Sequence, residues 1–115
     1  MNRLLRSFGY AFRGMKMYLR SGGNATIHIV ATILVIALGL WLNISVKNWC
    51  ILIIAIAMVH AAEAFNTAIE EVVNFISPQH HHLAEKIKDI AAGAVLITAI
   101  GAAIIGLLIF GQALL

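Results

Sequence analysis

The sequence predicts an all-α integral membrane protein, with an interfacial amphipathic helix followed by three membrane-spanning helices. Of its 115 residues, 62% are hydrophobic and only 11% are charged, and the mean hydropathy is +0.95. Soluble proteins carry about 25% charged residues, so this composition excludes an ordinary soluble domain. The length predicts a single domain, residues 1–115, because three spans and a short N-terminal arm use nearly every residue.

The first expected element is an amphipathic helix over about residues 2–20. At about 100° per residue, its apolar side chains gather on one side and its cations on the other. The cations are Arg3, Arg6, Arg13, Lys16 and Arg20. Such a helix lies in the interface of an anionic leaflet. No convincing small-residue cleavage site follows the positive segment, so we expect this segment to be retained.

Three long apolar helices are expected next. They occupy about residues 25–42, 49–76 and 83–115. Paired glycines precede the first of these helices, and we expect Asn24 to cap it. The polar segment Asn43 to Asn48, flanked by Trp41 and Trp49, is expected to form the turn between the first two spans at one membrane interface. Pro78 is expected to end the second helix.

The placement of Lys and Arg predicts the orientation in the membrane. Five of them precede the first span and two lie between the second and third spans, whereas Lys47 alone lies in the other loop. The positive-inside rule therefore places the N-terminus in the cytoplasm. The net charge of +3 and the pI near 9.4 then indicate binding to a membrane surface and no nucleic-acid partner. Small residues in the last span favour a homo-oligomer, although such residues are common in any membrane helix.

The segment HAAEAFNTAIEEVVNF, His60 to Phe75, carries the strongest chemical signal. Glu63, Asn66 and Glu70 are spaced i, i+3 and i+7, which places them on one side of a helix. Glu63 lies about 21 Å along the helix from Trp49, and thus inside the edge of a hydrocarbon core of about 30 Å. A carboxylate there is costly to desolvate and is placed to accept a proton from a lipid alcohol. The competing structural interpretation of Glu63 and of Glu70 is a helix–helix hydrogen bond or a solvated helix end.

Lys88 and Asp89 enter the membrane together at the start of the last span, opposite this polar stripe. A lysine there neutralises phosphate oxygens, and an aspartate holds a divalent cation or orients a nucleotide. The alternative is a simple interfacial anchor. Together with the carboxylates, the pair indicates phosphoryl transfer to a lipid alcohol, with the chemistry at the cytoplasmic interface. The sequence contains no P-loop and no kinase glycine loop.

The histidines are predicted to have structural or interfacial roles. Consecutive histidines in a loop, as in QHHH, Gln79 to His82, do not fix a chelating geometry, so a hydrated loop is favoured over a metal site. His28 and His60 lie within the apolar spans. We expect them to donate interhelical hydrogen bonds rather than to bind a ligand.

These residues resemble the prokaryotic diacylglycerol kinase family, which includes undecaprenol kinases. The resemblance covers nearly the whole chain, from SFGYAFRGM through EAFNTAIEEVV to KDIAAGAV. It implies a small lipid kinase of the bacterial inner membrane, a homotrimer that uses ATP and Mg²⁺ at the cytoplasmic surface. It also implies that Glu63 is the catalytic base and that Glu70 is a magnesium ligand. The positions that it assigns to nucleotide or active-site contacts are Arg3, Tyr10, Asn66, Gln79, His80, His81, Lys88 and Asp89.

The chain departs from the family pattern at two positions. Gly22 stands where the family usually has a metal-binding glutamate, so Glu71, Asn24, water or phosphate oxygens would have to complete the magnesium site. Asn74 replaces an aspartate that is common after EVV, with a smaller expected effect.

The substrate and the activity leave alternatives open. NATIH, Asn24 to His28, is more similar to members from Gram-positive bacteria, which favour undecaprenol, than to the enterobacterial enzymes, which favour diacylglycerol. A catalytically weak or inactive relative is one alternative, motivated by Gly22. A small proton-coupled transport protein that uses Glu63 is another, although Cys50 to Val59 offers it no polar path.

Overall fold

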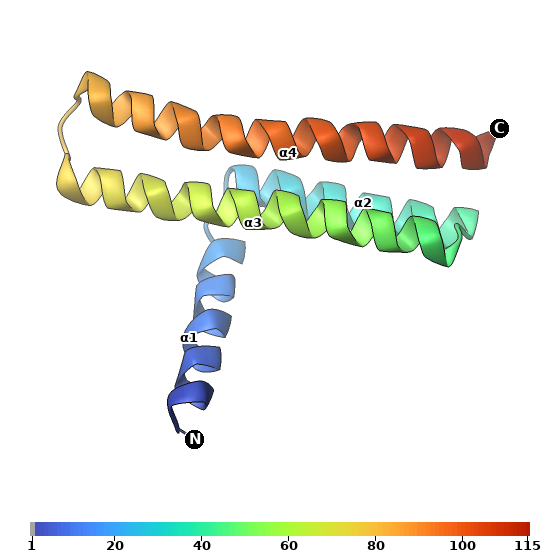
Figure 1. The fold of residues 1–115 in the computed structure, drawn as a ribbon, viewed down its shortest axis with the longest axis horizontal. Coiled ribbons are helices and arrows are strands. Elements are labelled where there is room, and N and C mark those ends of the chain that lie inside the picture. Colours follow the sequence, from blue (N-terminus) through green and yellow to red (C-terminus); the bar gives the residue numbers. More distant parts are fainter. Residues whose placement is uncertain (1) are drawn as a thin grey trace.

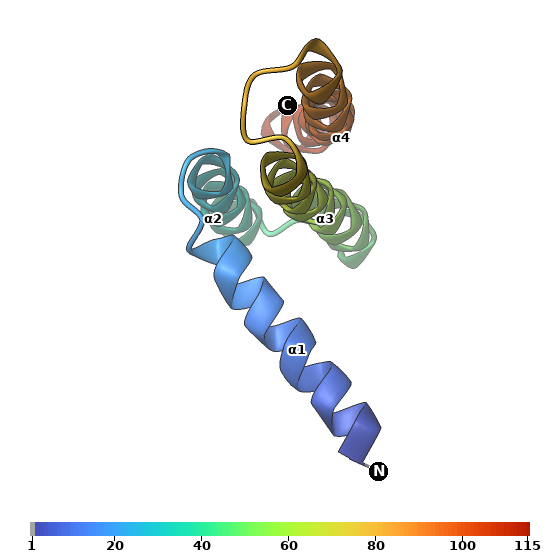
Figure 2. The ribbon, with the colours of Figure 1, turned by 90° about the vertical axis from the view of Figure 1, so that its left-hand side faces the viewer.

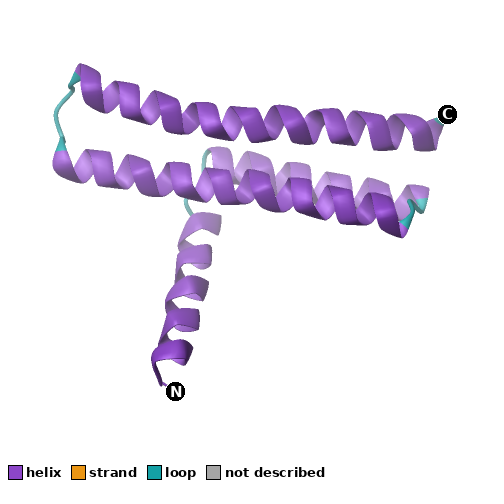
Figure 3. Ribbon diagram, in the orientation of Figure 1, coloured by secondary structure: helices purple, strands orange, loops and turns teal. Residues whose placement is uncertain are grey.

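A computed structural model describes residues 2–115 as four α-helices (Figure 1). They are α1 (Asn2–Leu19), α2 (Asn24–Leu42), α3 (Val46–Ile76) and α4 (His82–Leu114). The last three are long and apolar enough to cross a membrane. Helices joined by short loops account for all of the described secondary structure (Figure 3). The predicted all-α membrane fold is confirmed, and the homotrimer stays a prediction.

The three long helices form an antiparallel bundle in which α3 lies between α2 and α4. Seen along the bundle, α2 and α4 lie on different sides of α3 (Figure 2). The interface between α3 and α4 is the most extensive in the molecule. Helix α1 leaves the bundle at a steep angle and carries the N-terminus away from it (Figure 1). This arrangement suits an interfacial helix beside spans that run along the membrane normal.

The turn between α2 and α3 is shorter than the sequence predicted. Helix α3 already begins at Val46, because the Ser45 hydroxyl accepts a hydrogen bond from the Asn48 N–H at 3.2 Å and so caps the helix. Asn43 closes α2 in the left-handed conformation, with φ 53°. At the other end, α3 stops at Ile76, ahead of Pro78, as expected.

The expected cap at Asn24 is wrong. Asn24 is the first residue of α2, Gly23 occupies the cap position, and no side chain caps the helix. Gly22 and Gly23 have φ values of 76° and 55°, which glycine adopts without a steric penalty. The chain therefore turns through its two glycines, and the side chain of Asn24 is not needed.

One stripe of α3 contains more buried residues than any other helix of the bundle. Its buried residues are Leu52, Ala55, Val59, Glu63, Asn66 and Val73. The spacing of mainly three or four residues keeps them on one face of the helix. At the end near the α2–α3 turn, Leu52 packs with Ile109 and Phe110 of α4 in an apolar cluster. Further along the same stripe the buried side chains become polar.

Candidate active site

Glu63 and Asn66 are the buried polar residues of the described chain, and each exposes only 4% of its surface. Glu63 lies 17 residues after the start of α3. That is about 26 Å along the helix, inside the far edge of a hydrocarbon core of about 30 Å. The first turn of α3 contains the polar residues Lys47 and Asn48, however, so a membrane edge near Trp49 still gives Glu63 the depth of about 21 Å that the sequence suggested.

The Glu63 carboxyl group faces α2, where His28 Nε2 lies 3.6 Å from Glu63 Oε2. This separation is too long for a hydrogen bond, so the expected interhelical bond of His28 is not formed here. Within residues 2–115, Glu63 Oε2 and Asn66 Oδ1 are the buried side-chain atoms without a hydrogen-bond partner. Buried polar atoms are nearly always paired, so two orphaned oxygens one helical turn apart mark a place where a ligand would complete the bonding.

Asn66 links the buried part of the stripe to its exposed end. Its Nδ2 donates a hydrogen bond of 2.8 Å to Glu70 Oε1, and the carboxylate of Glu70 is exposed. The two residues thus lie side by side, as their spacing predicted. The carboxyl group of Glu63 is buried, whereas that of Glu70 is exposed.

Lys88 and Asp89 of α4 point in different directions. Lys88 Nζ donates a hydrogen bond of 2.5 Å to Asn74 Oδ1 in the last turns of α3. Asp89 is exposed and borders a shallow hollow of about 450 Å³ on α4, together with Glu85 and Lys86. Successive helical residues are about 100° apart, so only one of the two can face α3. The structure places the lysine against α3 and the aspartate on an outer face.

The loop between α3 and α4 has its own hydrogen bonds. The Leu83 N–H donates to His81 Nδ1 at 3.1 Å, so His81 caps α4. His80 Nε2 lies 3.5 Å from the Glu85 carboxylate. Ser77 donates to the carbonyl oxygen of Gln79 at 3.2 Å. The loop histidines and Gln79 are exposed, so their remaining polar atoms are open to a ligand at the membrane surface.

Helix α1 leads away from the bundle toward the N-terminus (Figures 1 and 2). Arg3 and Tyr10 belong to the first half of this helix, on the side of the N-terminus. Both are exposed, and Arg13 stacks over the Tyr10 ring at 5.1 Å. Within one chain, these two residues are therefore not brought to Glu63. Sequence reasoning without the family resemblance had no signal for them, because they belong to an ordinary interfacial helix.

A polar cluster surrounds His60, one helical turn before Glu63. Two of its members, Tyr18 and Thr32, were not predicted from the sequence. His60 Nδ1 lies 2.7 Å from the Tyr18 hydroxyl, and His60 Nε2 lies 2.8 Å from Thr32 Oγ1. The interhelical hydrogen bond expected of His60 is confirmed, and its partners come from α1 and α2. Burial raises the pKa of Tyr18, and the nearby Glu63 carboxylate adds to the shift. Tyr18 therefore stays protonated and acts as a donor. Its signal in the sequence was a hydroxyl at the C-terminal end of the amphipathic helix.

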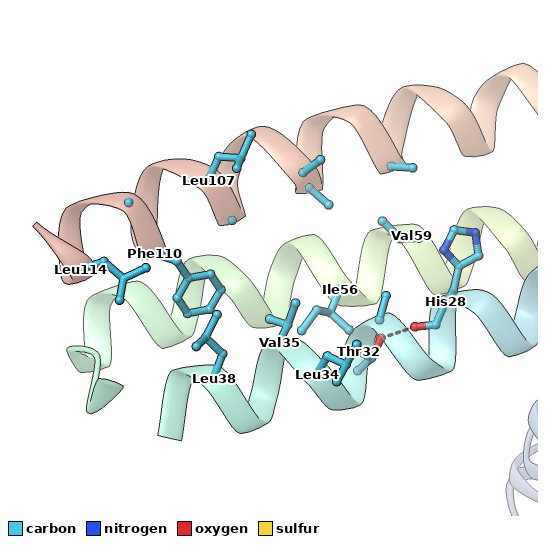
Figure 4. A pocket seen from close by; sticks show the side chains of 16 residues that line it. His28, Thr32, Leu34, Val35, Leu38, Ile56, Val59, Leu107, Phe110 and Leu114 are labelled. Carbon is cyan, nitrogen blue, oxygen red and sulfur yellow. Dashed lines mark hydrogen bonds between the residues drawn. The ribbon is translucent and has the colours of Figure 1, made fainter. Parts of the chain in front are cut away.

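An apolar cavity of about 730 Å³ lies between α2, α3 and α4 (Figure 4). His28 and Thr32 are its only polar lining residues, and they lie at one end, whereas Phe110 and Leu114 lie at the other. His28 also faces Glu63, so the polar end of the cavity adjoins the buried carboxylate. Glu63 itself does not line the cavity, and His28 lies between the cavity and the carboxyl group.

The oxygen atoms of the stripe fit a magnesium ion held jointly with phosphate. Mg²⁺ takes oxygen ligands, usually one or two carboxylates plus substrate phosphates and water. Glu70 offers an exposed carboxylate and Asn66 an orphaned amide oxygen. No group of three or more His, Cys, Asp or Glu within residues 2–115 could enclose a metal by itself. Such a site would therefore need phosphate oxygens to complete it.

Comparison with known proteins identifies the class. Residues 9–110 match the family model described as prokaryotic diacylglycerol kinase. The chain is 40% identical to an undecaprenol kinase of Bacillus subtilis, over 96% of this chain and 89% of that protein. It is 36% identical to a diacylglycerol kinase of Synechocystis, over 90% of this chain and 59% of that protein. It is 30% identical to the diacylglycerol kinase of Escherichia coli, over 89% of this chain and 84% of that protein.

The apolar helices, the buried carboxylate and these relatives together define a membrane-embedded lipid kinase, an enzyme that uses ATP. The chain belongs to the prokaryotic diacylglycerol kinase family. The resemblance noted in its motifs is confirmed.

Proposed function

We propose that the protein transfers the γ-phosphate of ATP to the hydroxyl of a membrane lipid alcohol, with undecaprenol preferred over diacylglycerol. The reaction takes place at the cytoplasmic face of the bacterial inner membrane. The observation that carries the proposal is Glu63: a buried carboxylate at bilayer depth, with an orphaned oxygen, next to an apolar cavity. NATIH and the 40% identity to an undecaprenol kinase support the choice of substrate.

In the proposed reaction, the lipid tail lies in the apolar cavity and the hydroxyl emerges at its His28 end. Glu63 accepts the hydroxyl proton while the oxygen attacks the γ-phosphorus, the bond to the β-phosphate oxygen breaks, and ADP leaves. The carboxyl group then returns the proton to water at the interface. A dry pocket favours this transfer because charge on a buried carboxylate is costly to maintain without a partner.

The nucleotide occupies the exposed end of the same stripe. Glu70 and Asn66 would hold magnesium, which neutralises charge on the phosphate oxygens when it is bound. Lys88, beside Asn74, supplies a cation for the phosphates, and Gln79, His80 and His81 contact the nucleotide from the loop. Asp89 acts from the rim of the site, since its side chain lies on an outer face of α4.

The expected contacts of Arg3 and Tyr10 require a second chain. Because α1 points away from its own bundle, these residues would serve the site of a neighbouring subunit in a homotrimer (Figure 1). Large apolar side chains are exposed along all three spans, which is compatible with both lipid and subunit contacts.

Gly22 bears on the alternative of a weak or inactive enzyme. A glutamate at this position would have to adopt φ 76°, in a left-handed region that side chains with a Cβ rarely occupy. The turn is therefore built for glycine, and a simple replacement would strain it. The transport alternative gains no support from the structure, because the α3 stripe before Glu63 is buried and apolar from Leu52 to Val59.

The test is direct phosphorylation in vesicles. The purified protein is incubated with γ-labelled ATP, Mg²⁺ and either undecaprenol or diacylglycerol, and the lipids are extracted. We expect label in both lipids and a higher kcat/KM for undecaprenol. Glu63→Gln should lower turnover by about 10²- to 10⁴-fold, the usual contribution of a general base. Near-normal turnover of that variant would remove Glu63 from the mechanism, and nucleotide binding without any labelled lipid would favour the inactive alternative.

A further inference from the structure

Helix α1 is joined to the bundle by a single side-chain hydrogen bond within the described residues. Tyr18 is half-buried, whereas every other residue from Asn2 to Leu19 is exposed. Within residues 2–115, the Tyr18–His60 bond is the only side-chain hydrogen bond that joins α1 to another helix. The link to α2 contains two glycines and is not stiffened by a capping side chain. The direction in which α1 leaves the bundle therefore depends strongly on this one contact.

The hydrogen bonds around His60 have a defined direction. The Thr32 hydroxyl donates its only proton to the carbonyl oxygen of His28, at 2.7 Å, because a carbonyl can only accept. Thr32 Oγ1 must then accept from His60 Nε2–H at 2.8 Å. In this neutral tautomer His60 Nδ1 carries no proton, so it accepts from the Tyr18 hydroxyl at 2.7 Å. The chain of donors runs from α1 through α3 to α2.

This chain of hydrogen bonds ends next to the catalytic carboxylate. His60 lies three residues, or about one helical turn, before Glu63 on α3. The last acceptor in this series of hydrogen bonds is the backbone carbonyl of His28. His28 Nε2 lies 3.6 Å from Glu63 Oε2, and the centroids of the His28 and His60 rings are 6.3 Å apart. The charge of Glu63 also contributes to the raised pKa of Tyr18. The fastening point of α1 and the proposed base therefore share one small region.

We propose that His60 is a positioning residue for phosphoryl transfer, which holds α1 at a fixed angle through Tyr18 and braces α2 through Thr32. The inference rests on the proposed function in one respect, that α1 carries nucleotide contacts at Arg3 and Tyr10. Arg3 lies 15 residues from Tyr18, or about 22 Å along the helix. A change of about 10° at Tyr18 would therefore move Arg3 by about 4 Å, and errors of about 1 Å in positioning already impair catalysis.

The kinetic test compares Tyr18→Phe and His60→Leu, which break the chain, with His60→Gln, whose amide can accept from Tyr18 and donate to Thr32. We expect the two disrupting variants to raise KM for MgATP by about 3- to 10-fold, as the loss of one or two hydrogen bonds implies, with KM for the lipid unchanged. His60→Gln should restore most of the loss. The double variant Tyr18→Phe with His60→Leu should be no worse than His60→Leu alone, because Tyr18→Phe removes a hydrogen bond that His60→Leu has already broken.

Thr98→Val on α4 is the matched control for the loss of a hydroxyl. The Thr98 hydroxyl bonds only to the Val95 carbonyl of its own helix, so this variant should keep the wild-type KM values. Equal KM values for MgATP in wild type, Tyr18→Phe and His60→Leu would overturn the positioning role. So would a parallel loss for MgATP and lipid that His60→Gln does not rescue.

A distance measurement separates this inference from the proposed function. Spin labels at Phe12→Cys on α1 and Phe75→Cys on α3 are placed in a Cys50→Ser background and diluted with unlabelled protein in vesicles. Both positions are exposed. We expect a narrow distance distribution in the otherwise wild-type chain, a broad one with Tyr18→Phe, and recovery of the narrow one with His60→Gln in place of His60→Leu. An unchanged distribution would refute the fastening of α1 even if lipid phosphorylation is confirmed, and a failure of lipid phosphorylation would not alter this result.

Discussion

The two halves of the buried stripe on α3 use the same geometry for different purposes. In the first half, Leu52, Ala55 and Val59 pack against the neighbouring helices, and Leu52 contacts Ile109 and Phe110. In the second half, Glu63 and Asn66 occupy the equivalent buried positions and leave two oxygen atoms unpaired. The first half is filled by apolar packing, whereas the second half leaves two buried oxygen atoms without a hydrogen-bond partner within residues 2–115.

The difference indicates that the site occupies positions that would otherwise form the core. A carboxylate in such a position is held by packing on a rigid helix, which is favourable for catalysis. It also destabilises the fold, because a buried charge without a partner is costly. The apolar half, anchored by Leu52 and by the close packing of Gly39 on Trp49, must supply the stability that the polar half lacks.

The largest effect on turnover is expected when the polar half of the stripe is made apolar, like the first half. Glu63→Leu should lower lipid-dependent turnover by about 10²- to 10⁴-fold, since the proposed base is lost. Its thermal stability should equal or exceed that of the wild type, because an unpaired buried carboxyl group is replaced by a well-packed side chain. Turnover and thermal unfolding are measured on the same preparation. Glu85→Gln, an exposed carboxylate on α4, is the control, and lower stability of Glu63→Leu would contradict the comparison.

The second prediction concerns the close packing of the apolar half at Gly39. A Cβ at Gly39 would lie 2.7 Å from Trp49 Cη2 and 3.3 Å from Ile44 Cδ1. Gly39→Ala should therefore destabilise the protein by about 1–3 kcal/mol through overpacking, with turnover per folded molecule unchanged. Gly101→Ala is the matched control, because nothing lies within 4 Å of its Cβ and alanine favours a helix. Equal unfolding temperatures for the two variants would show that the turn region is not closely packed.

The cavity between α2, α3 and α4 is tested by partly filling it. Gly106 lines the cavity and has no heavy atom within 4 Å of an added Cβ, so Gly106→Leu should be accommodated. We expect KM for the lipid to rise by about 3- to 10-fold, corresponding to about 1 kcal/mol of lost binding, with KM for MgATP unchanged. Gly101→Leu, outside the cavity, is the control. A change of oligomeric state in the Gly106 variant alone, with normal lipid KM, would show instead that a second chain covers this space.

The smallest effect is expected at Asn74. Asn74→Asp would convert the hydrogen bond from Lys88 into an ion pair, and exposed pairs of this kind contribute only about 0.2–1 kcal/mol. We expect a slight gain in stability, and a rise of about twofold in KM for MgATP because the lysine becomes less free for phosphate. Asn48→Asp at the opposite end of α3 controls for the added charge. A fall in KM for MgATP would show that the extra carboxylate assists nucleotide binding.

The geometry of the polar stripe could be predicted because its signals are local. The spacing of Glu63, Asn66 and Glu70 fixes their common side on any helix, and the contact between Asn66 and Glu70 follows from it. The start of α3 was misplaced by three residues because the Ser45 cap lies inside a segment that also reads as a polar turn. The cap at Asn24 failed since two adjacent glycines turn the chain by themselves.

The sequence by itself determined the three apolar helices, the amphipathic helix and the polar stripe, because these depend on composition and on the fixed period of a helix. Only the tertiary structure decided that His28 faces Glu63, that Lys88 reaches Asn74 while Asp89 turns outward, and that α1 is fastened by Tyr18 to His60. These contacts depend on how each helix is rotated about its axis and tilted against its neighbours. The balance of packing between residues far apart in the chain sets those angles, and no local pattern records them.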